Sequence, residues 1–561
     1  MSESVYPHMV QEYYVARLRE LAAARAEERK QVRTRKDVLR LRNQVRRRLR
    51  SCFAPRPKKT PLNPVTTGVV RRKAYAIEKV IYESRPGFKV TANLYVPHGG
   101  GPFPVVLGPC GHSAEGKAYD MYQAFASGLA RRGYMVLVYD PLSQGERYQI
   151  RRRIGSFRPG NCCHEHNMFG NRLALLGDFF GMWRAWDGIR GLDYLLGRPE
   201  ADRTRVGVTG NSGGGTLTTY VSALDDRVTM AAPSCFITTF LCNLENELPA
   251  DSEQTPPGIL AAGLDFADYF VAQIPRPVLL LGQQDDYFDV RGLRQTFEEL
   301  RRLYRIVGAE DKVELFVGSH GHGFYADNRH AMYRFFGKHA GRPATVRPSE
   351  SRPEEERTLW AAPEGSVLKA GSRNMSVLLK EEARAVEAGR RRLRGVALKR
   401  AIVRALGLPA RTGVPHYRVL RPRPSGSSRF KSHSLFAVES EAGIQVILHL
   451  YGPDGRFHLP ERRGATVFVP HVSTEEDVRS GLAPNRREIF AVDVRGIGLT
   501  EALTCRVSEF FHPYGSDYMY AVHGQMLSEP YLGRRVHDLL CVLDLLASKG
   551  CRRVELVGRG L

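Results

Sequence analysis

Apolar residues between positions 74 and 340 form short runs that alternate with longer amphipathic stretches. The runs at 74–82 and 88–96 predict an antiparallel pair of strands. Six later runs are almost wholly apolar, as expected for strands covered by helices on both faces: 104–108, 134–140, 205–210, 228–234, 277–282 and 312–318. The amphipathic stretch 182–197 directly precedes one of these runs, as a strand–helix–strand unit requires. The pattern predicts an α/β domain with a mostly parallel sheet.

The pattern and composition of the sequence divide the chain into four parts. Residues 1–65 form a basic helical arm that ends in a proline-rich lead-in, and 66–345 hold the α/β domain. Residues 346–415 are a linker rich in proline and charge, followed by a helical segment. Residues 416–561 are predicted to form a second, smaller α/β domain.

This second domain repeats the first. Its segments FAVESEAGIQVILHLYGP, GATVFVPH and IFAVDVRGIG echo, in order, the antiparallel pair and the first two buried runs. Asp493 and Gly498 have the same spacing as Asp140 and Gly145. A helix in each domain also carries one arginine and two aspartates at equal spacing: Arg184, Asp187 and Asp193 in the first, Arg535, Asp538 and Asp544 in the second. We interpret these matches as an internal duplication.

Composition excludes several classes of protein. Of the 561 residues, 42% are apolar and 25% are charged, and no run reaches the roughly 18 apolar residues of a membrane span. The first residues lack the pattern of a secretory signal, so we expect a cytoplasmic protein. Nine cysteines without a repeated CxxC spacing argue against a disulfide framework and against a zinc site. The adjacent Cys162 and Cys163 are interpreted as ordinary loop or core residues.

The net charge of +24 is concentrated partly in the N-terminal arm. Four apolar residues recur there at helical spacing: Val38, Leu41, Val45 and Leu49. Clustered cations favour binding to nucleic acid. However, residues 17–50 have no aromatic residues for base stacking and no recognised DNA- or RNA-binding motif. We therefore predict a solvated, arginine-rich helix, with nucleic-acid binding as the alternative.

Gly210-Asn211-Ser212-Gly213-Gly214 is a G-x-S-x-G sequence placed between a predicted strand and a predicted helix. In that position, flanking glycines allow a tight turn that lifts the serine hydroxyl above the sheet edge. Ser212 is therefore the candidate nucleophile.

A serine nucleophile needs a histidine base, and the histidine needs a carboxylate. The loop after the strand at 277–282 supplies Asp286, with Asp285 as its rival. The loop after the strand at 312–318 supplies His322, with His320 as its rival. Both loops follow the carboxyl ends of strands, where open α/β sheets carry ligands.

The oxyanion formed during acyl transfer needs hydrogen-bond donors. We assign this role to the backbone N–H groups of Gly213 and His112. The second lies in the loop after the strand at 104–108, where Gly111 permits a close backbone approach. The imidazole of His112 is either a substrate contact or an ordinary loop side chain.

The segments GPCGHSAEGKAY, GYMVLVYDPLSQGER, WDGIRGLDYLLGRPEADRTRVGVTGNSGGG, GQQDDYFDVRG and GHGF together resemble the acetyl xylan esterase and dienelactone hydrolase-like branch of the α/β-hydrolase superfamily, over about residues 74–340. The resemblance implies a serine esterase that acts on a carboxylic ester, often one attached to a polysaccharide. It implies no metal and no organic cofactor.

The second copy departs from this pattern, because Ser212 aligns with Gly560 and the sequence stops one residue later. We expect this copy to be partial and catalytically silent. It is either truncated in the given sequence, which we favour, or an incomplete domain with an exposed sheet edge. One alternative is a serine peptidase of the prolyl-oligopeptidase kind, although the segment before residue 66 is too short for a β-propeller. Another is a scaffold that binds an anionic partner through the basic arm.

Overall fold

The computed structural model describes residues 4–150, 162–248, 250–342, 352–411, 413–505 and 517–560. The chain forms two compact units. A large unit spans Ala23–Arg391, and a small unit combines Met1–Ala22 with Arg392–Leu561. One boundary falls inside helix α1 (Met9–Lys30), so the units do not follow the limits at 65, 345 and 415 that the sequence predicts.

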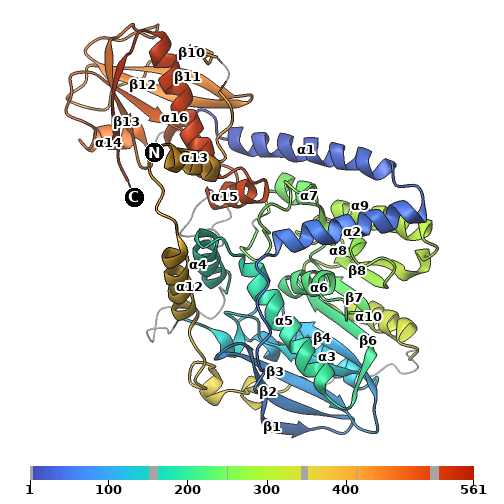
Figure 1. Cartoon of the computed structure of the whole chain (residues 1–561). Coiled ribbons are helices and arrows are strands. Elements are labelled where there is room, and N and C mark those ends of the chain that lie inside the picture. The colour runs from blue at the N-terminus through green and yellow to red at the C-terminus, as the bar shows by residue number, and fades with distance from the viewer. Residues whose placement is uncertain are drawn as a thin grey trace. The chain divides into compact units, whose positions relative to one another are not determined.

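The large unit is built on a nine-stranded sheet with the order β1-β2-β3-β5-β4-β6-β7-β8-β9. Figure 1 labels most of these strands and the helices around them. The pairs β1–β2, β2–β3 and β3–β5 are antiparallel. All later pairs in this order, from β5–β4 to β8–β9, are parallel. The strands are β1 (Val65–Arg71), β2 (Tyr75–Arg85), β3 (Phe88–Pro97), β4 (Phe103–Pro109), β5 (Met135–Tyr139), β6 (Ala201–Asn211), β7 (Met230–Ser234), β8 (Val278–Gln283) and β9 (Val313–Gly318). The predicted α/β-hydrolase fold is confirmed, while the largely exposed edge strand β1 was not predicted.

Helices cover both faces of this sheet. On one face, α3 (Asp120–Ala130) and α10 (Ala326–His339) share a hydrophobic cluster with the central strands. The other face carries α5 (Phe180–Gly197), α6 (Gly213–Leu224) and α9 (Val290–Ile306). The short helices α7 (Phe240–Glu245) and α8 (Phe266–Val271) lie between α6 and α9 in the sequence. All residues of β4, β5, β7 and β8 are buried, as the apolar runs predict.

The basic helix α2 (Arg35–Cys52) packs against α8 and α9. Its apolar stripe Val38, Leu41, Val45 and Leu49 is buried. Arg29, at the end of α1, pairs with the buried Asp268 over 2.6 Å. The expectation of a solvated arm is therefore corrected, because the helical stripe forms core and part of the basic charge is neutralised by acids of the same unit.

Residues 352–391 lie against the same α/β core. The carboxylate of Glu146 accepts hydrogen bonds from the backbone N–H groups of Ala361 and Ala362. Met375 and Leu379 of α12 (Met375–Gly389) belong to one hydrophobic cluster with residues of α4 (Cys162–Leu175). The remaining elements here are α11 (Glu356–Leu359) and the short 3-10 helix η4 (Pro363–Gly365). This segment therefore holds α4 in place.

The small unit has a six-stranded sheet with the order β10-β11-β12-β14-β13-β15, which reproduces the order β1-β2-β3-β5-β4-β6. Its strands are β10 (Tyr417–Leu420), β11 (Ser432–Glu441), β12 (Ile444–Gly452), β13 (Gly464–Val469), β14 (Ile489–Asp493) and β15 (Arg553–Gly558). Its helices are α13 (Gly395–Leu406), α14 (Thr474–Arg479), α15 (Asp517–Met526) and α16 (Tyr531–Ser548), besides the first part of α1. The predicted second α/β sheet domain is confirmed.

A buried aspartate after the second parallel strand recurs in both units. A Cβ on Gly145 would lie 2.3 Å from the Asp140 carboxylate, and the same contact recurs at Gly498 and Asp493. Both glycines have positive φ, 53° and 54°. An arginine that follows this aspartate pairs with the equivalent helix in each unit: Arg147 with Asp187, and Arg495 with Asp538. The strand β15 is largely exposed, in agreement with an open edge.

In the described part of the chain, no helix is both long enough and apolar enough to cross a membrane.

Truncating the buried face of α2 should destabilise the large unit. Leu41→Ala is expected to lower its free energy of unfolding by about 2–5 kcal/mol, because it leaves a cavity in packed core. All three tryptophans, Trp183, Trp186 and Trp360, lie in the large unit, so urea unfolding followed by their fluorescence measures this unit. The exposed Arg47→Ala on the same helix is the control, with an expected change within about 0.5 kcal/mol. Equal stability of the two variants would show that α2 is not part of the core.

Candidate active site

The predicted nucleophile, Ser212, lies at the turn between β6 and α6, which we call the nucleophile elbow. Ser212 has φ 59° and ψ −122°, a conformation that residues with side chains rarely adopt. Its backbone N–H donates to the carbonyl of Ser234, the last residue of β7, over 2.9 Å. The strained turn places the serine hydroxyl at the carboxyl end of the central strands.

The loop after β4 packs directly against this turn. A Cβ on Gly111 would lie 2.2 Å from the carbonyl oxygen of Asn211, and one on Gly214 would lie 2.3 Å from that of Pro109. Only glycine allows two backbone segments to approach this closely. The Gly111 N–H donates to the Tyr122 hydroxyl over 2.6 Å, which fixes the loop in this position.

The structure brings Asp286 and His322 together. Nδ1 of His322 lies 2.9 Å from Oδ1 of Asp286, whose side chain is 1% exposed. The Phe288 N–H donates to the same oxygen over 3.0 Å and orients the carboxylate. An Nδ1–H that donates to a buried carboxylate leaves Nε2 free to accept a proton, so this pair has the geometry of a general base and its orienting acid.

Two neighbouring residues connect this pair to the elbow. Cys235 directly follows Ser234, whose carbonyl accepts the Ser212 N–H. The Cys235 thiol lies within 4.8 Å of the Asp286 and His322 atoms that could bind a metal. The Tyr287 ring stacks on His322 with ring centroids 4.2 Å apart, and its hydroxyl interacts with Ser212. Because Nδ1 of His322 already donates to Asp286, we interpret this group as acid–base machinery and not as a metal site. Neither Cys235 nor Tyr287 was singled out from the sequence.

The rival residues lie apart from this pair. Asp285 is exposed, and its backbone N–H donates to the carbonyl of His320 over 3.1 Å. The His320 side chain is 48% exposed and packs against Tyr325, with ring centroids 4.4 Å apart. The nearest carboxylate to His320 among its ion pairs is Asp327, at 3.9 Å. The geometry favours Asp286 and His322.

Both proposed oxyanion donors lie at the elbow. Gly213 is the first residue of α6, so its N–H has no acceptor inside the helix. The His112 ring approaches the same residue, because a Cβ on Gly213 would lie 3.0 Å from Cε1 of His112. Neither backbone N–H donates to any group among the described residues. Both are therefore available to an oxygen bound at Ser212.

A buried charged network behind His112 was not predicted. Nε2 of His112 lies 3.2 Å from Oδ2 of Asp251 and 3.1 Å from Oε1 of Glu253. Arg184 pairs with the other oxygen of Glu253 over 2.6 Å. Burial lowers the pKa of His112, but the charges of Cys162, Asp251 and Glu253 outweigh this effect and raise the pKa well above its ordinary value. No motif marks these acids, since only the fold brings them beside the loop after β4.

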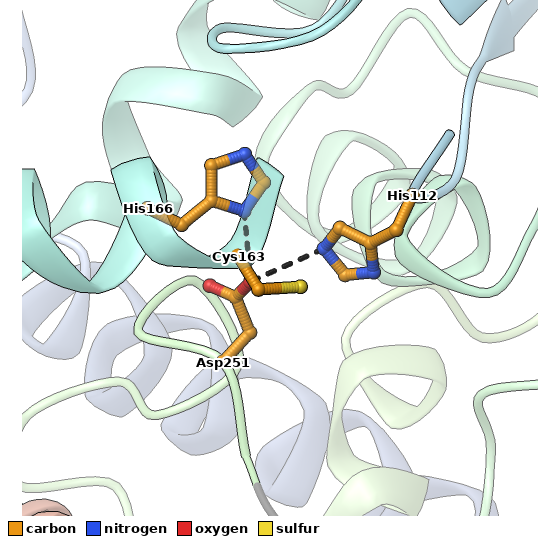
Figure 2. Close-up of side chains that lie close together, drawn as sticks. All are labelled: His112, Cys163, His166 and Asp251. Atoms are coloured by element: carbon orange, nitrogen blue, oxygen red, sulfur yellow. Dashed lines mark hydrogen bonds and ion pairs between the residues drawn. The ribbon is translucent and has the colours of Figure 1, made fainter. Parts of the chain in front are cut away.

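Four side chains of this region place ligand-type atoms within 4.8 Å of one another: His112, Cys163, His166 and Asp251 (Figure 2). These are residue types that bind transition metals.

Comparisons with known proteins show what the chain is similar to. Residues 54–256 match the family model described as Acetyl xylan esterase (AXE1). The chain is 25% identical over 317 residues to YtaP of Bacillus subtilis (strain 168), named as a hydrolase, over 53% of this chain and 99% of YtaP. Solved structures with similarity include Methylesterase BT1017, with 23% identity, a TM-score of 0.49 and coverage of 67% of this chain and 80% of that chain. They also include the acetyl xylan esterase from Paenibacillus sp. R4, with 18% identity, a TM-score of 0.37 and coverage of 55% and 96%.

The family model includes the elbow serine and the loop of His112, and Asp286 and His322 follow it along the chain. Residues 54–256 of the large unit therefore match the acetyl xylan esterase family model on an α/β-hydrolase fold, and the protein is a serine hydrolase of carboxylic esters.

Proposed function

We propose that the large unit removes acetyl groups from a glycan through a triad of Ser212, His322 and Asp286. The observation that carries this proposal is the strained serine at the end of β6 together with the hydrogen-bonded Asp286–His322 pair at the ends of β8 and β9. Three strand ends thus contribute the three groups that acyl transfer through a serine requires.

In the first step, Nε2 of His322 takes the proton of the Ser212 hydroxyl while the serine oxygen attacks the ester carbonyl. The resulting imidazolium is stabilised by Asp286, with which Nδ1 shares its hydrogen bond. The imidazolium then protonates the departing alcohol, and the acyl group remains on Ser212. A water molecule, deprotonated by the same histidine, releases the acid and restores the serine.

The tetrahedral oxyanion of both steps is held by the backbone N–H groups of Gly213 and His112. Gly213 lies at the N-terminus of α6, where the helix dipole also favours negative charge. A single donor of this kind contributes roughly 3–4 kcal/mol to transition-state stabilisation. The position of His112 depends on the close contact of its loop with the elbow.

The acetylated glycan is inferred from the family model, which describes an acetyl xylan esterase. The peptidase alternative is not favoured, because the described residues before β1 form helices α1 and α2 and not propeller blades. The scaffold alternative is not favoured, because the large unit carries the groups of a complete triad.

The substrate and the nucleophile are tested together. We expect release of acetate from acetylated xylo-oligosaccharides and from a chromogenic acetate ester, and no release of methanol from methyl glucuronate. Ser212→Ala should fold normally and lose several orders of magnitude in turnover, because only binding and oxyanion stabilisation remain. The exposed Ser51→Ala is the control and should keep full activity. Wild-type rates in Ser212→Ala would exclude this nucleophile, whereas methanol release alone would exclude the acetyl substrate.

The acid–base pair is tested by neighbouring substitutions in the same loops. His322→Ala should match Ser212→Ala in its loss of kcat, because residues that act as a unit fail together. His320→Ala should change kcat by less than about tenfold, since its ring packs on Tyr325. Steady-state kinetics on the chromogenic acetate gives both values. A greater loss in His320→Ala would move the base to that residue.

The oxyanion site is tested by substituting Gly111, which permits the loop after β4 to approach the elbow closely. Gly111→Ala should lower kcat by roughly 10²–10³-fold, because its Cβ would meet the Asn211 carbonyl and displace the loop that carries the His112 donor. Gly100→Ala, whose Cβ would have nothing within 4 Å, is the matched control and should leave kcat unchanged. Equal kcat values in these two variants would show that the loop contributes no donor.

A further inference from the structure

The cluster beside the oxyanion site combines groups from three separate segments (Figure 2). His112 lies in the loop after β4, and Asp251 lies between α7 and α8. Cys163 and His166 lie three residues apart on the first turns of α4, a spacing that puts both side chains on one face of the helix. The ligand-type atoms of all four lie within 4.8 Å of one another.

The protonation of His166 is constrained by its surroundings. Nε2 lies 3.0 Å from the backbone carbonyl of Leu142, which can only accept a hydrogen bond, so Nε2 carries a proton. In the neutral ring the lone pair is then on Nδ1, and Nδ1 lies 2.7 Å from Oδ2 of Asp251. At this distance the two atoms share a positive group, which is either a proton on Nδ1 or a bound cation. A backbone carbonyl that fixes the tautomer in this way is also the usual support of a metal-binding histidine.

His112 supplies a second, independent observation. Its Nε2 is buried and points toward Asp251 and Glu253, yet it makes no hydrogen bond of acceptable geometry in the described part of the chain. Both imidazoles therefore direct a ring nitrogen at the same carboxylate oxygen. The other oxygen of Asp251 accepts the backbone N–H of Glu253 over 3.0 Å, which leaves Oδ2 for the cluster.

The Arg184 guanidinium does not lie between Nδ1 of His166 and Oδ2 of Asp251. Nη1 of Arg184 lies 3.2 Å from Nδ1 and 3.3 Å from Nε2 of His166. An atom in the ring plane at these nearly equal distances would clash with Cε1, so Nη1 lies over the face of the ring. The guanidinium is moreover paired with Glu253 over 2.6 Å and with Gln144 over 2.8 Å. The Asp251 carboxylate and a Cys163 thiolate would balance exactly two positive charges, those of a divalent cation.

We propose that Nε2 of His112, Sγ of Cys163, Nδ1 of His166 and Oδ2 of Asp251 bind one Zn²⁺ ion. Two imidazoles, one thiolate and one carboxylate form a four-coordinate set that suits this metal. Binding replaces the thiol proton of Cys163, which is released to solvent, together with any proton shared by the imidazoles. No electron is transferred.

Four protein ligands leave no open position for a substrate, so the ion is structural. It ties α4 and the segment of Asp251 to the loop that carries the His112 oxyanion donor. The sequence has no CxxC repeat that would indicate zinc, because these ligands lie up to 139 positions apart and only the fold brings them together.

The test is a Co²⁺ titration of the full-length protein after removal of metal with a chelator. We expect one Co²⁺ per chain, the intense visible bands of four-coordinate Co²⁺ and a near-ultraviolet thiolate-to-cobalt band. Zn²⁺ should displace the Co²⁺, and elemental analysis should find about one Zn²⁺ per chain after reconstitution. These readouts do not depend on esterase activity.

Neighbouring cysteines give a matched pair of variants. Cys163→Ser should lose the thiolate-to-cobalt band, whereas Cys162→Ser should keep it. Asp251→Asn should weaken Zn²⁺ binding at least tenfold and provides a second variant if Cys163→Ser does not fold. Binding below 0.1 ion per chain, or a thiolate band that persists in Cys163→Ser, would overturn the site. In the first case an imidazolium proton, not a metal, occupies the space between His166 and Asp251.

Discussion

The close packing of the loop after β4 against the nucleophile elbow is the constraint on which the rest of the site depends. It requires glycine on both sides, because a Cβ on Gly111 or Gly214 would lie within 2.3 Å of a backbone oxygen. The contact fixes the loop that carries His112, the proposed oxyanion donor, beside the elbow. It also turns the His112 side chain toward Asp251, Glu253 and the helix α4. One backbone contact therefore connects the oxyanion site, the strained serine and the buried charged network.

The two units show which parts of the fold are independent of this site. Both have the same strand order over six strands, and both place an aspartate against a glycine of positive φ: Asp140 with Gly145 in the large unit and Asp493 with Gly498 in the small unit. This aspartate–glycine contact stabilises the turn after the second parallel strand, and it does so with or without a neighbouring elbow serine. We infer that it belongs to the architecture that the two copies share, whereas the loops after β4, β8 and β9 specialise the large unit for chemistry.

Much of the fold and the elbow could be predicted from the sequence. Buried strands such as β4 and β5 are continuous apolar runs, and the G-x-S-x-G sequence lies between a strand and a helix. The edge strands β1 and β10 were missed because none of their residues is buried, so neither forms a long, wholly apolar run. The basic arm was misjudged because net charge is visible in a sequence, while the acids that neutralise it, such as Asp268, lie more than two hundred positions away. The network of Asp251 and Glu253 was missed for the same reason.

The most direct test of the catalytic geometry is a crystal structure of the protein inactivated by a diethyl phosphoryl ester, whose tetrahedral phosphorus imitates the acyl-transfer intermediate. We expect phosphorus bonded to the Ser212 hydroxyl oxygen and one phosphoryl oxygen roughly 2.7–3.1 Å from the backbone nitrogens of both Gly213 and His112. The His322 ring should lie within hydrogen-bond distance of the serine oxygen. An adduct on another residue, or a phosphoryl oxygen turned away from both nitrogens, would contradict the proposed active site.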